Sequence, residues 1–85
     1  DREEEYLLFG LANEVGELLG KHKKAIRGDY VNHADKLDEL GDVCWYLARL
    51  MDHYDVTAME ILHRNFVKLT DRKSRGVIKG DGDKR

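Results

Sequence analysis

Apolar residues recur at helical spacing along the whole chain, and no proline interrupts them. No stretch alternates apolar and polar residues in the way that a half-buried strand does. The spacing therefore predicts an all-α protein, an antiparallel helical bundle of three to four helices per protomer. We expect helices over about 3–26, 34–53 and 58–72, each with one apolar stripe turned toward the core.

The predicted stripes differ in how densely they are filled. The first two are Leu7, Leu8, Leu11, Val15, Leu18 and Leu19, then Leu37, Leu40, Val43, Cys44, Leu47, Leu50 and Met51. The third is sparser, with Met59, Leu62, Phe66 and Leu69 facing inward.

Local signals predict where these helices end. Arg27-Gly28-Asp29 is a typical stop, and either Asp29 or Asn32 is placed to cap the second helix. Thr57 and Glu60 have the spacing of a capping box. From Ser74 onward the chain is rich in glycine and charge, so we assign residues 72–85 to a tail of a single domain, 1–85.

Three glycines lie inside the first predicted helix, at positions 10, 16 and 20. Each lowers helix stability by about 1 kcal/mol relative to alanine. Such a concentration predicts close approach by another backbone. In the second helix, Cys44 is expected to pack as a small hydrophobe and Trp45 to lie in the core or a subunit interface.

The length of 85 residues fits one small domain. A core of this size is modest, and the single cysteine excludes an internal disulfide, so we expect a homo-oligomer, a dimer or tetramer. The net charge of -2 argues against nucleic acid as a partner, and no apolar stretch is long enough to span a membrane. Lone-cysteine usage and the absence of a signal-peptide pattern predict a cytoplasmic location. The chain begins without Met on a helical pattern, which predicts a preceding segment.

Two pairs of acids carry the strongest chemical signal. Glu14 and Glu17 share a face of the first helix, and Glu39 and Asp42 share a face of the second. Both pairs follow one pattern (acid, apolar, Gly, acid, apolar) and border the apolar stripes. A single pair usually means a solvated face. Two pairs brought together by packing would instead repel one another unless a cation lay between them.

All four groups offer hard oxygen ligands, which suit Mg²⁺, with Mn²⁺ as a substitute. The pattern thus favours metal-assisted phosphate chemistry. A di-iron carboxylate bundle is the nearest alternative, but it needs Glu-x-x-His on two helices. That motif occurs once, at Glu60 and His63, where we assign Glu60 to the cap and His63 to the surface.

Several other polar residues are candidates for substrate contact. Tyr46 follows Asp42 by one helical turn, where it could hold a base or sugar or serve as an ordinary interface residue. Lys21 and Lys24 lie on the acid face of the first helix, where local ion pairs with Glu17 and other acids are favoured over phosphate contacts. A polar stripe follows one face of the third predicted helix and comprises Asn65, Lys68 and Arg72. These residues could bind phosphates or could form a solvated edge of the helix, and both interpretations remain open.

With both acid pairs in place, the chain closely resembles the MazG-like family of all-α nucleoside triphosphate pyrophosphohydrolases. The matching stretches are Leu11–Leu18 (LANEVGEL), Leu37–Val43 (LDELGDV) and the segment from Asp71 to Asp83. The likeness covers nearly the whole chain. Its departure is at the start, where the family usually has a further helical segment, and this affects the base pocket more than the metal site.

The resemblance implies a fold, an activity and a set of site residues. Such proteins cleave an NTP or dNTP between the α- and β-phosphates, a house-cleaning reaction on noncanonical or excess nucleotides, and they form dimers and tetramers. By motif, the metal-binding and catalytic residues are Glu14, Glu17, Glu39 and Asp42. The substrate contacts are Tyr46, Asn65, Lys68 and Arg72. Two alternatives stay open: a non-catalytic helical module that binds metal, and a related hydrolase with a different leaving group.

Overall fold

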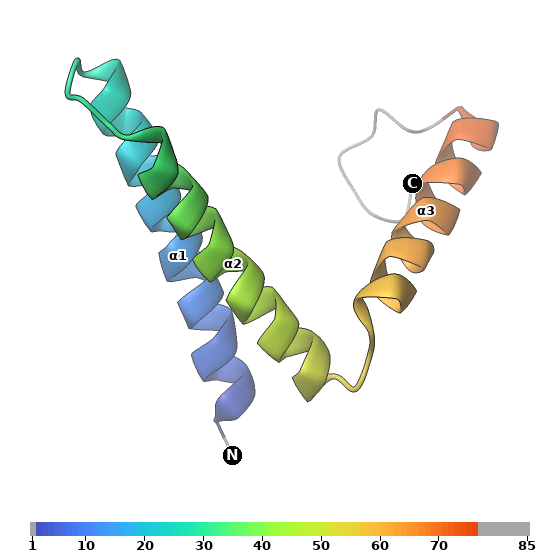
Figure 1. Ribbon diagram of the computed structural model, residues 1–85. Helices are drawn as coiled ribbons and strands as arrows, with labels where there is room; N and C mark the ends of the chain where they lie inside the picture. The colour runs from blue at the N-terminus through green and yellow to red at the C-terminus, as the bar shows by residue number, and fades with distance from the viewer. Residues whose placement is uncertain (1, 77–85) are drawn as a thin grey trace. The chain divides into compact units, whose positions relative to one another are not determined.

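A computed structural model describes residues 2–76 of the chain (Figure 1). Over this range the chain forms α1 (Glu3–Ile26), α2 (His33–His53) and α3 (Ala58–Arg75), with no strand. The predicted all-α class is confirmed. No helix within residues 2–76 has the length and apolar character needed to cross a membrane. Predictions about the segment from position 77 onward lie outside the described residues.

The chain divides into two compact units, Asp1–Asp55 and Val56–Arg85. The first holds α1 and α2, and the second holds α3. The assignment of 1–85 to one domain stays a prediction. Because both acid pairs lie on α1 and α2, the candidate site can be described within the first unit alone.

The helix ends follow local chemistry. After α1, the amides of Gly28 and Asp29 donate to the carbonyls of Ala25 and Lys24 in a Schellman arrangement, and Gly28 has a φ of 100°. Asn32 Oδ1 accepts from the amide of Ala34 at 2.9 Å and caps α2. The expected stop and the Asn32 cap are both confirmed.

At the start of α3, Thr57 Oγ1 accepts from the amide of Glu60 at 3.1 Å, which confirms the predicted cap. The Glu60 carboxylate accepts from the Thr57 hydroxyl at 3.2 Å. The other end of α3 differs from expectation. The helix continues to Arg75 and ends where Gly76 adopts the left-handed conformation, so the tail cannot begin at residue 72.

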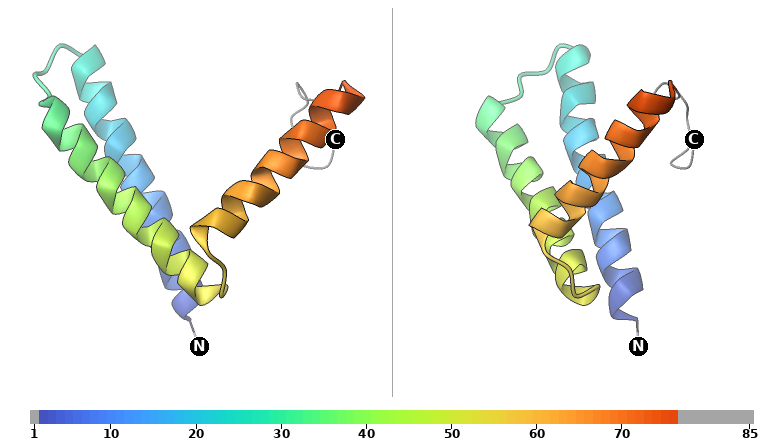
Figure 2. Two further views of the ribbon diagram at one scale, coloured as in Figure 1. Left: turned by 45° about the vertical axis from the view of Figure 1, so that its right-hand side comes forward. Right: turned by 90° about the vertical axis from the view of Figure 1, so that its right-hand side faces the viewer.

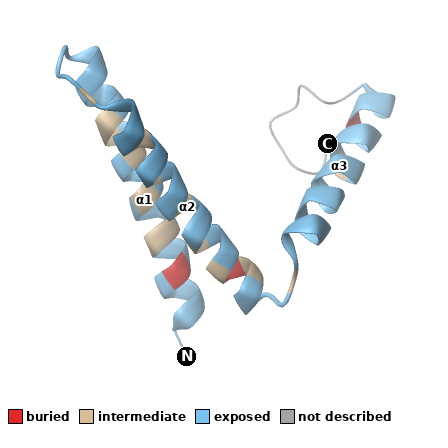
Figure 3. Ribbon diagram, in the orientation of Figure 1, coloured by how far each residue is buried: buried red, intermediate tan, exposed pale blue. Residues whose placement is uncertain are grey.

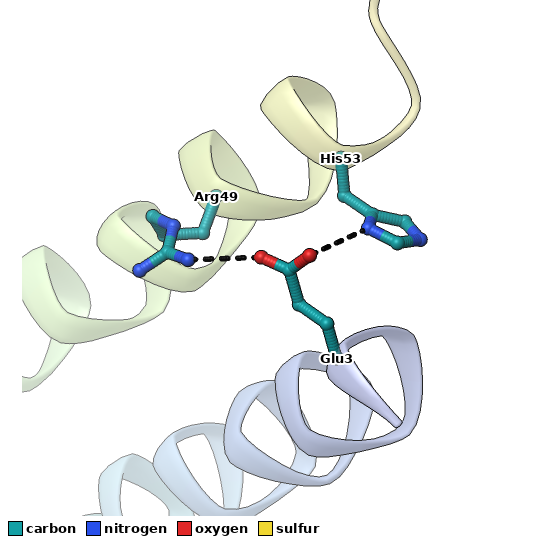
Figure 4. A network of polar contacts seen from close by, with 3 residues as sticks. All are labelled: Glu3, Arg49 and His53. Atoms are coloured by element: carbon teal, nitrogen blue, oxygen red, sulfur yellow. Dashed lines mark hydrogen bonds and ion pairs between the residues drawn. The ribbon is translucent and has the colours of Figure 1, made fainter. Parts of the chain in front are cut away.

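Helices α1 and α2 form an antiparallel hairpin and lie side by side in every view (Figure 2). At its open end, Glu3 accepts from Arg49 at 3.1 Å and lies 3.2 Å from His53 Nδ1 (Figure 4). At its closed end, Lys21 Nζ lies 3.5 Å from Glu39 Oε1. These contacts fix the register, although exposed ion pairs each contribute about 1 kcal/mol or less.

Few apolar side chains are buried (Figure 3). Leu7 is 1% exposed and Leu50 is 6% exposed, and these two residues form the buried core of the described chain. Several predictions of burial are therefore wrong. Cys44 is exposed rather than packed, and Leu19 is 62% exposed. Trp45 is 52% exposed, so it lies outside the core of the single chain, and its place in a subunit interface stays a prediction.

The predicted stripe of α3 is also exposed, by 40% to 74% at Met59, Leu62, Phe66 and Leu69. The physical reason is geometric. Helix α3 is the one described helix of its unit, so no second described helix of that unit covers its stripe. In the hairpin, two helices share a single seam, so a stripe wider than that seam needs a further surface to cover it.

The uncovered apolar residues of the hairpin share one side. Each follows a seam residue by one position, which turns it by about 100° around its helix. Because α1 and α2 are antiparallel, both turns lead to the same side of the hairpin. We call this the apolar side. It comprises Leu8, Val15, Leu19, Leu40, Cys44 and Leu47.

Gly10 lies beneath an aromatic ring. A Cβ built at Gly10 would lie 2.1 Å from Cε1 and 2.4 Å from Cζ of Tyr46. The expectation of another backbone at this position is therefore wrong, because the close neighbour is a side chain. At Gly16 and Gly20, apart from the neighbouring residues and the backbone of the same helix, no atom of the described chain lies within 4 Å of such a Cβ.

This difference predicts opposite effects for one substitution. Gly16→Ala is expected to stabilise the chain by up to about 1 kcal/mol through helix propensity alone. Gly10→Ala is expected to destabilise it by about 1–3 kcal/mol, because the new methyl displaces the Tyr46 ring. Urea unfolding of both variants measures the contrast. A Gly10→Ala, Tyr46→Ala double variant should show strong non-additivity. Equal stabilisation of the chain by Gly16→Ala and Gly10→Ala would show that the Tyr46 ring does not lie against Gly10.

Candidate metal centre

Three carboxylates from two helices meet at the centre of the hairpin. Glu14, Glu39 and Asp42 each offer an oxygen, and these oxygens all lie within 4.8 Å of one another. The ligand oxygens around an octahedral Mg²⁺ lie about 3–4 Å apart, given bonds of 2.0–2.1 Å. Small side-chain movements therefore suffice to bring this trio onto one cation.

Two of these groups have an oxygen without a protein partner. Oε2 of Glu14 and Oε2 of Glu39 are buried and accept no hydrogen bond within the described part of the chain. A buried carboxylate oxygen without a hydrogen-bond partner destabilises the fold. A cation placed between them removes this penalty, so the donor set fits a divalent metal better than it fits a purely structural role.

The carboxylates also alter one another's protonation. Partial burial raises the pKa of Glu14 above its ordinary 4.5, and the charges of Glu17, Asp42 and Glu39 raise it further. A carboxyl with a raised pKa holds its proton to higher pH and is a stronger base once ionised. Metal binding at this point therefore competes with protonation.

The shift at Glu14 predicts how stability depends on pH. A carboxyl whose pKa is higher in the folded chain stabilises the fold below its ordinary pKa, and that contribution is lost as pH rises through the raised value. In metal-free buffer we expect the urea midpoint to fall as pH rises above 4.5. Glu14→Gln should flatten this fall, and saturating Mg²⁺ should oppose it. Asp38→Asn, at an exposed position, is the control and should keep the wild-type dependence of the urea midpoint on pH. The same dependence in Glu14→Gln would contradict the raised pKa of Glu14.

Glu17 lies outside the trio, although the sequence pattern predicts it as a metal ligand together with Glu14, Glu39 and Asp42. Its Oε1 accepts a hydrogen bond from Asn13 Nδ2 at 3.4 Å, and its side chain lines a neighbouring hollow. The hollow measures about 250 Å³, and its lining is Glu17, Gly20, Lys21, Lys24 and Glu39. The four predicted acids therefore form a close trio with a fourth acid one turn away along α1.

Tyr46 lies beside the trio, on the same side of the hairpin. Partial burial and the neighbouring Tyr6 hydroxyl raise its pKa, and the charges of Glu14 and Asp42 raise it further. Its ring meets the Trp45 ring edge-on at 5.0 Å, and Arg49 lies 5.3 Å over that Trp45 ring. The role of Tyr46 toward a substrate stays a prediction.

The remaining predicted contacts lie on α3, in the second unit. Asn65, Lys68 and Arg72 recur there at helical spacing, Arg72 is 8% exposed and Lys68 is half-buried. Their role toward the acids stays a prediction.

Sequence reasoning left open one pairing that the structure settles. Lys21 pairs with Glu39 across the helix interface. Within residues 2–76 it is the cation that pairs with a member of the acid cluster. The antiparallel register could have revealed it, because Lys21 follows Glu14 by seven residues along α1 and Glu39 precedes Asp42 on α2.

No protein-family model matches the chain, and no solved structure matches it. A curated relative does. The chain is 46% identical over 85 residues to the Gene 37 protein of Mycobacterium phage L5, with 94% of this chain and 75% of the phage protein covered. The chain belongs to the family of that phage protein. The relative's name states no activity, so the function of this member of the Gene 37 family follows from the chemistry of its own residues.

Proposed function

We propose that this chain is a Mg²⁺-dependent nucleoside triphosphate pyrophosphohydrolase of the MazG-like kind. Its substrate is an NTP or dNTP, its products are the monophosphate and pyrophosphate, and its role is the removal of noncanonical or excess nucleotides. The observation that supports this proposal is the convergence of Glu14, Glu39 and Asp42 within 4.8 Å, from two helices. Mn²⁺ is the expected substitute metal.

The residues divide into ligands and a base. Glu14, Glu39 and Asp42 hold the cation in this proposal. The cation supplies charge neutralisation for the phosphates when it is bound. Glu17, the fourth metal ligand that the resemblance implies, lies outside the close trio, and we assign to it the orientation of the attacking water and the acceptance of its proton. Both helices hold these groups rigidly, so positioning and charge stabilisation account for most of the catalysis.

The nucleotide contacts come from the family resemblance. Tyr46 is assigned to the nucleotide because it lies beside Glu14 and Asp42, whose charges affect its pKa. Asn65, Lys68 and Arg72 are assigned to the base or the phosphates. The proposed assembly is a dimer or tetramer of antiparallel helical bundles.

A non-catalytic metal-binding module is a second candidate. The same trio supports it, because burial of unpaired Glu14 and Glu39 oxygens stabilises metal binding whether or not turnover follows. A hydrolase with a different leaving group is a third. The nature of the released phosphate distinguishes it from a pyrophosphohydrolase.

The deciding experiment incubates the purified chain with a panel of NTPs and dNTPs in Mg²⁺. Pyrophosphate and orthophosphate are measured separately, and a chelator is the control. Metal-dependent release of pyrophosphate supports the proposal and ranks the bases. Release of orthophosphate indicates the different leaving group. Metal binding without release of either favours the non-catalytic module.

A further inference from the structure

The hollow beside the acid trio combines two lysines with two acids. Lys21 and Lys24 come from adjacent turns of α1, and Gly20 lines the same hollow. Apart from its chain neighbours and the backbone of its own helix, a Cβ added at Gly20 would meet no atom of the described chain within 4 Å, so this part of the hollow is open. An anion can therefore approach both ammonium groups from solvent.

Lys21 is held loosely. Its Nζ lies 3.5 Å from Glu39 Oε1, longer than the 2.7–2.9 Å of a strong charge-assisted hydrogen bond. The lysine side chain is 30% exposed and the Glu39 side chain is 15% exposed. Lys24 forms no ion pair with any described residue. Both ammonium groups are thus available to a ligand that outcompetes one long ion pair.

Charge balance points to an anionic ligand. The three carboxylates of the trio and Glu17, which lines the same hollow, leave the centre with a net charge of about -2 when one divalent cation is bound, and this charge repels a phosphate. The two lysines neutralise that charge. Lys21 and Lys24 therefore remove the repulsion that a metal-loaded centre would otherwise exert on a polyphosphate.

We infer that Lys21 and Lys24 form the subsite for the terminal phosphates of the substrate, and so for the pyrophosphate product. This inference rests on the proposed function. Glu39 would exchange Lys21 for a bound metal, and the Lys21 ammonium would then be available to the phosphate. Lys21 therefore opposes metal binding in the free protein and strengthens phosphate binding in the loaded one.

The two roles of Lys21 predict effects of opposite sign in one variant. Titration calorimetry of Lys21→Met with Mg²⁺ alone should show binding about two- to fivefold tighter, since a competing ammonium is gone. Titration of the Mg²⁺-loaded variant with inorganic pyrophosphate should show binding weakened at least about tenfold. Lys24→Met should weaken only the pyrophosphate binding.

Lys23→Met is the matched control, because Lys23 lies on the same turn of α1 and does not line the hollow. It should change neither affinity. Lys21→Gln serves as a second variant, and thermal unfolding establishes that each variant is folded. Unchanged pyrophosphate affinity in folded Lys21→Met or Lys21→Gln, or weakened Mg²⁺ binding, overturns the inference.

Glu39→Gln separates this failure from failure of the proposed function. Suppose that the wild type binds Mg²⁺, that Glu39→Gln does not, and that pyrophosphate affinity is unchanged in Lys21→Met and Lys24→Met. This combination overturns the proposed phosphate subsite and leaves the metal centre in place. Mg²⁺ binding that is unaffected by Glu39→Gln removes the metal centre, and the proposed function with it.

Discussion

Glu39→Gln is expected to reduce Mg²⁺-dependent pyrophosphate release at least about a hundredfold, without unfolding the chain. Glu39 belongs to the trio, its side chain is 15% exposed, and its Oε2 is buried without a hydrogen-bond partner in the described chain. Glutamine has the same shape but lacks the anionic oxygen that a hard cation needs. The rate of pyrophosphate release under saturating Mg²⁺ measures the loss.

Stability separates a lost ligand from a lost fold. In metal-free buffer, Glu39→Gln removes one of several repelling charges and one ion pair with Lys21, so its unfolding midpoint should stay close to that of the wild type. Added metal should stabilise the wild type by about 2.7 kcal/mol at a hundred times its dissociation constant. The variant should gain far less.

Asp38→Asn is the matched control for Glu39→Gln. Asp38 precedes Glu39 on α2 and is exposed, and it lies outside the carboxylate trio. This variant should keep both the activity and the response to metal. A Glu39→Gln protein that retains most of its activity would show that the metal site is wrongly assigned.

The helices and their ends were predictable because they depend on neighbours in the sequence. Thr57, Asn32 and Gly28 act through hydrogen bonds or backbone conformations that span a few residues. The convergence of the acid pairs was also predictable, since both border apolar stripes that must face each other. Glu14 and Asp42 meet in the same antiparallel register that pairs Glu3 with His53.

Burial was predicted less well, because periodicity identifies an apolar face without identifying what covers it. Leu19 and Cys44 belong to that face and are nevertheless exposed. The unequal standing of Glu14 and Glu17 has a similar cause. Glu17 follows Glu14 by three residues, so the two side chains point in directions about 60° apart around the axis of α1, and Glu14 lies nearer the seam between α1 and α2. Sequence spacing alone cannot fix where the seam runs.

The wild-type chain is expected to assemble as a dimer or tetramer, with a second copy covering the apolar side. Leu7 and Leu50 are the two buried apolar side chains, and together they contribute about 3–6 kcal/mol. Ordering the backbone opposes folding by about 1–2 kcal/mol per residue, so this core needs further burial. The apolar side supplies it, because its leucines are exposed by 39% to 62%.

Leu19→Asp is therefore expected to raise the dissociation constant by about a hundredfold or more, since each copy loses the burial of one leucine. Leu19 is 62% exposed in the single chain, so the substitution should do little harm unless another copy covers it. Tyr30→Asp is the control, because Tyr30 lies in the segment that connects α1 to α2 and is 90% exposed. This variant should assemble as the wild type does. Sedimentation velocity and circular dichroism measure assembly and helix content together. A wild-type chain that sediments as a folded monomer would mean that the chain covers its own apolar side. A Leu19→Asp variant that assembles with the same dissociation constant as the wild type would place the interface elsewhere.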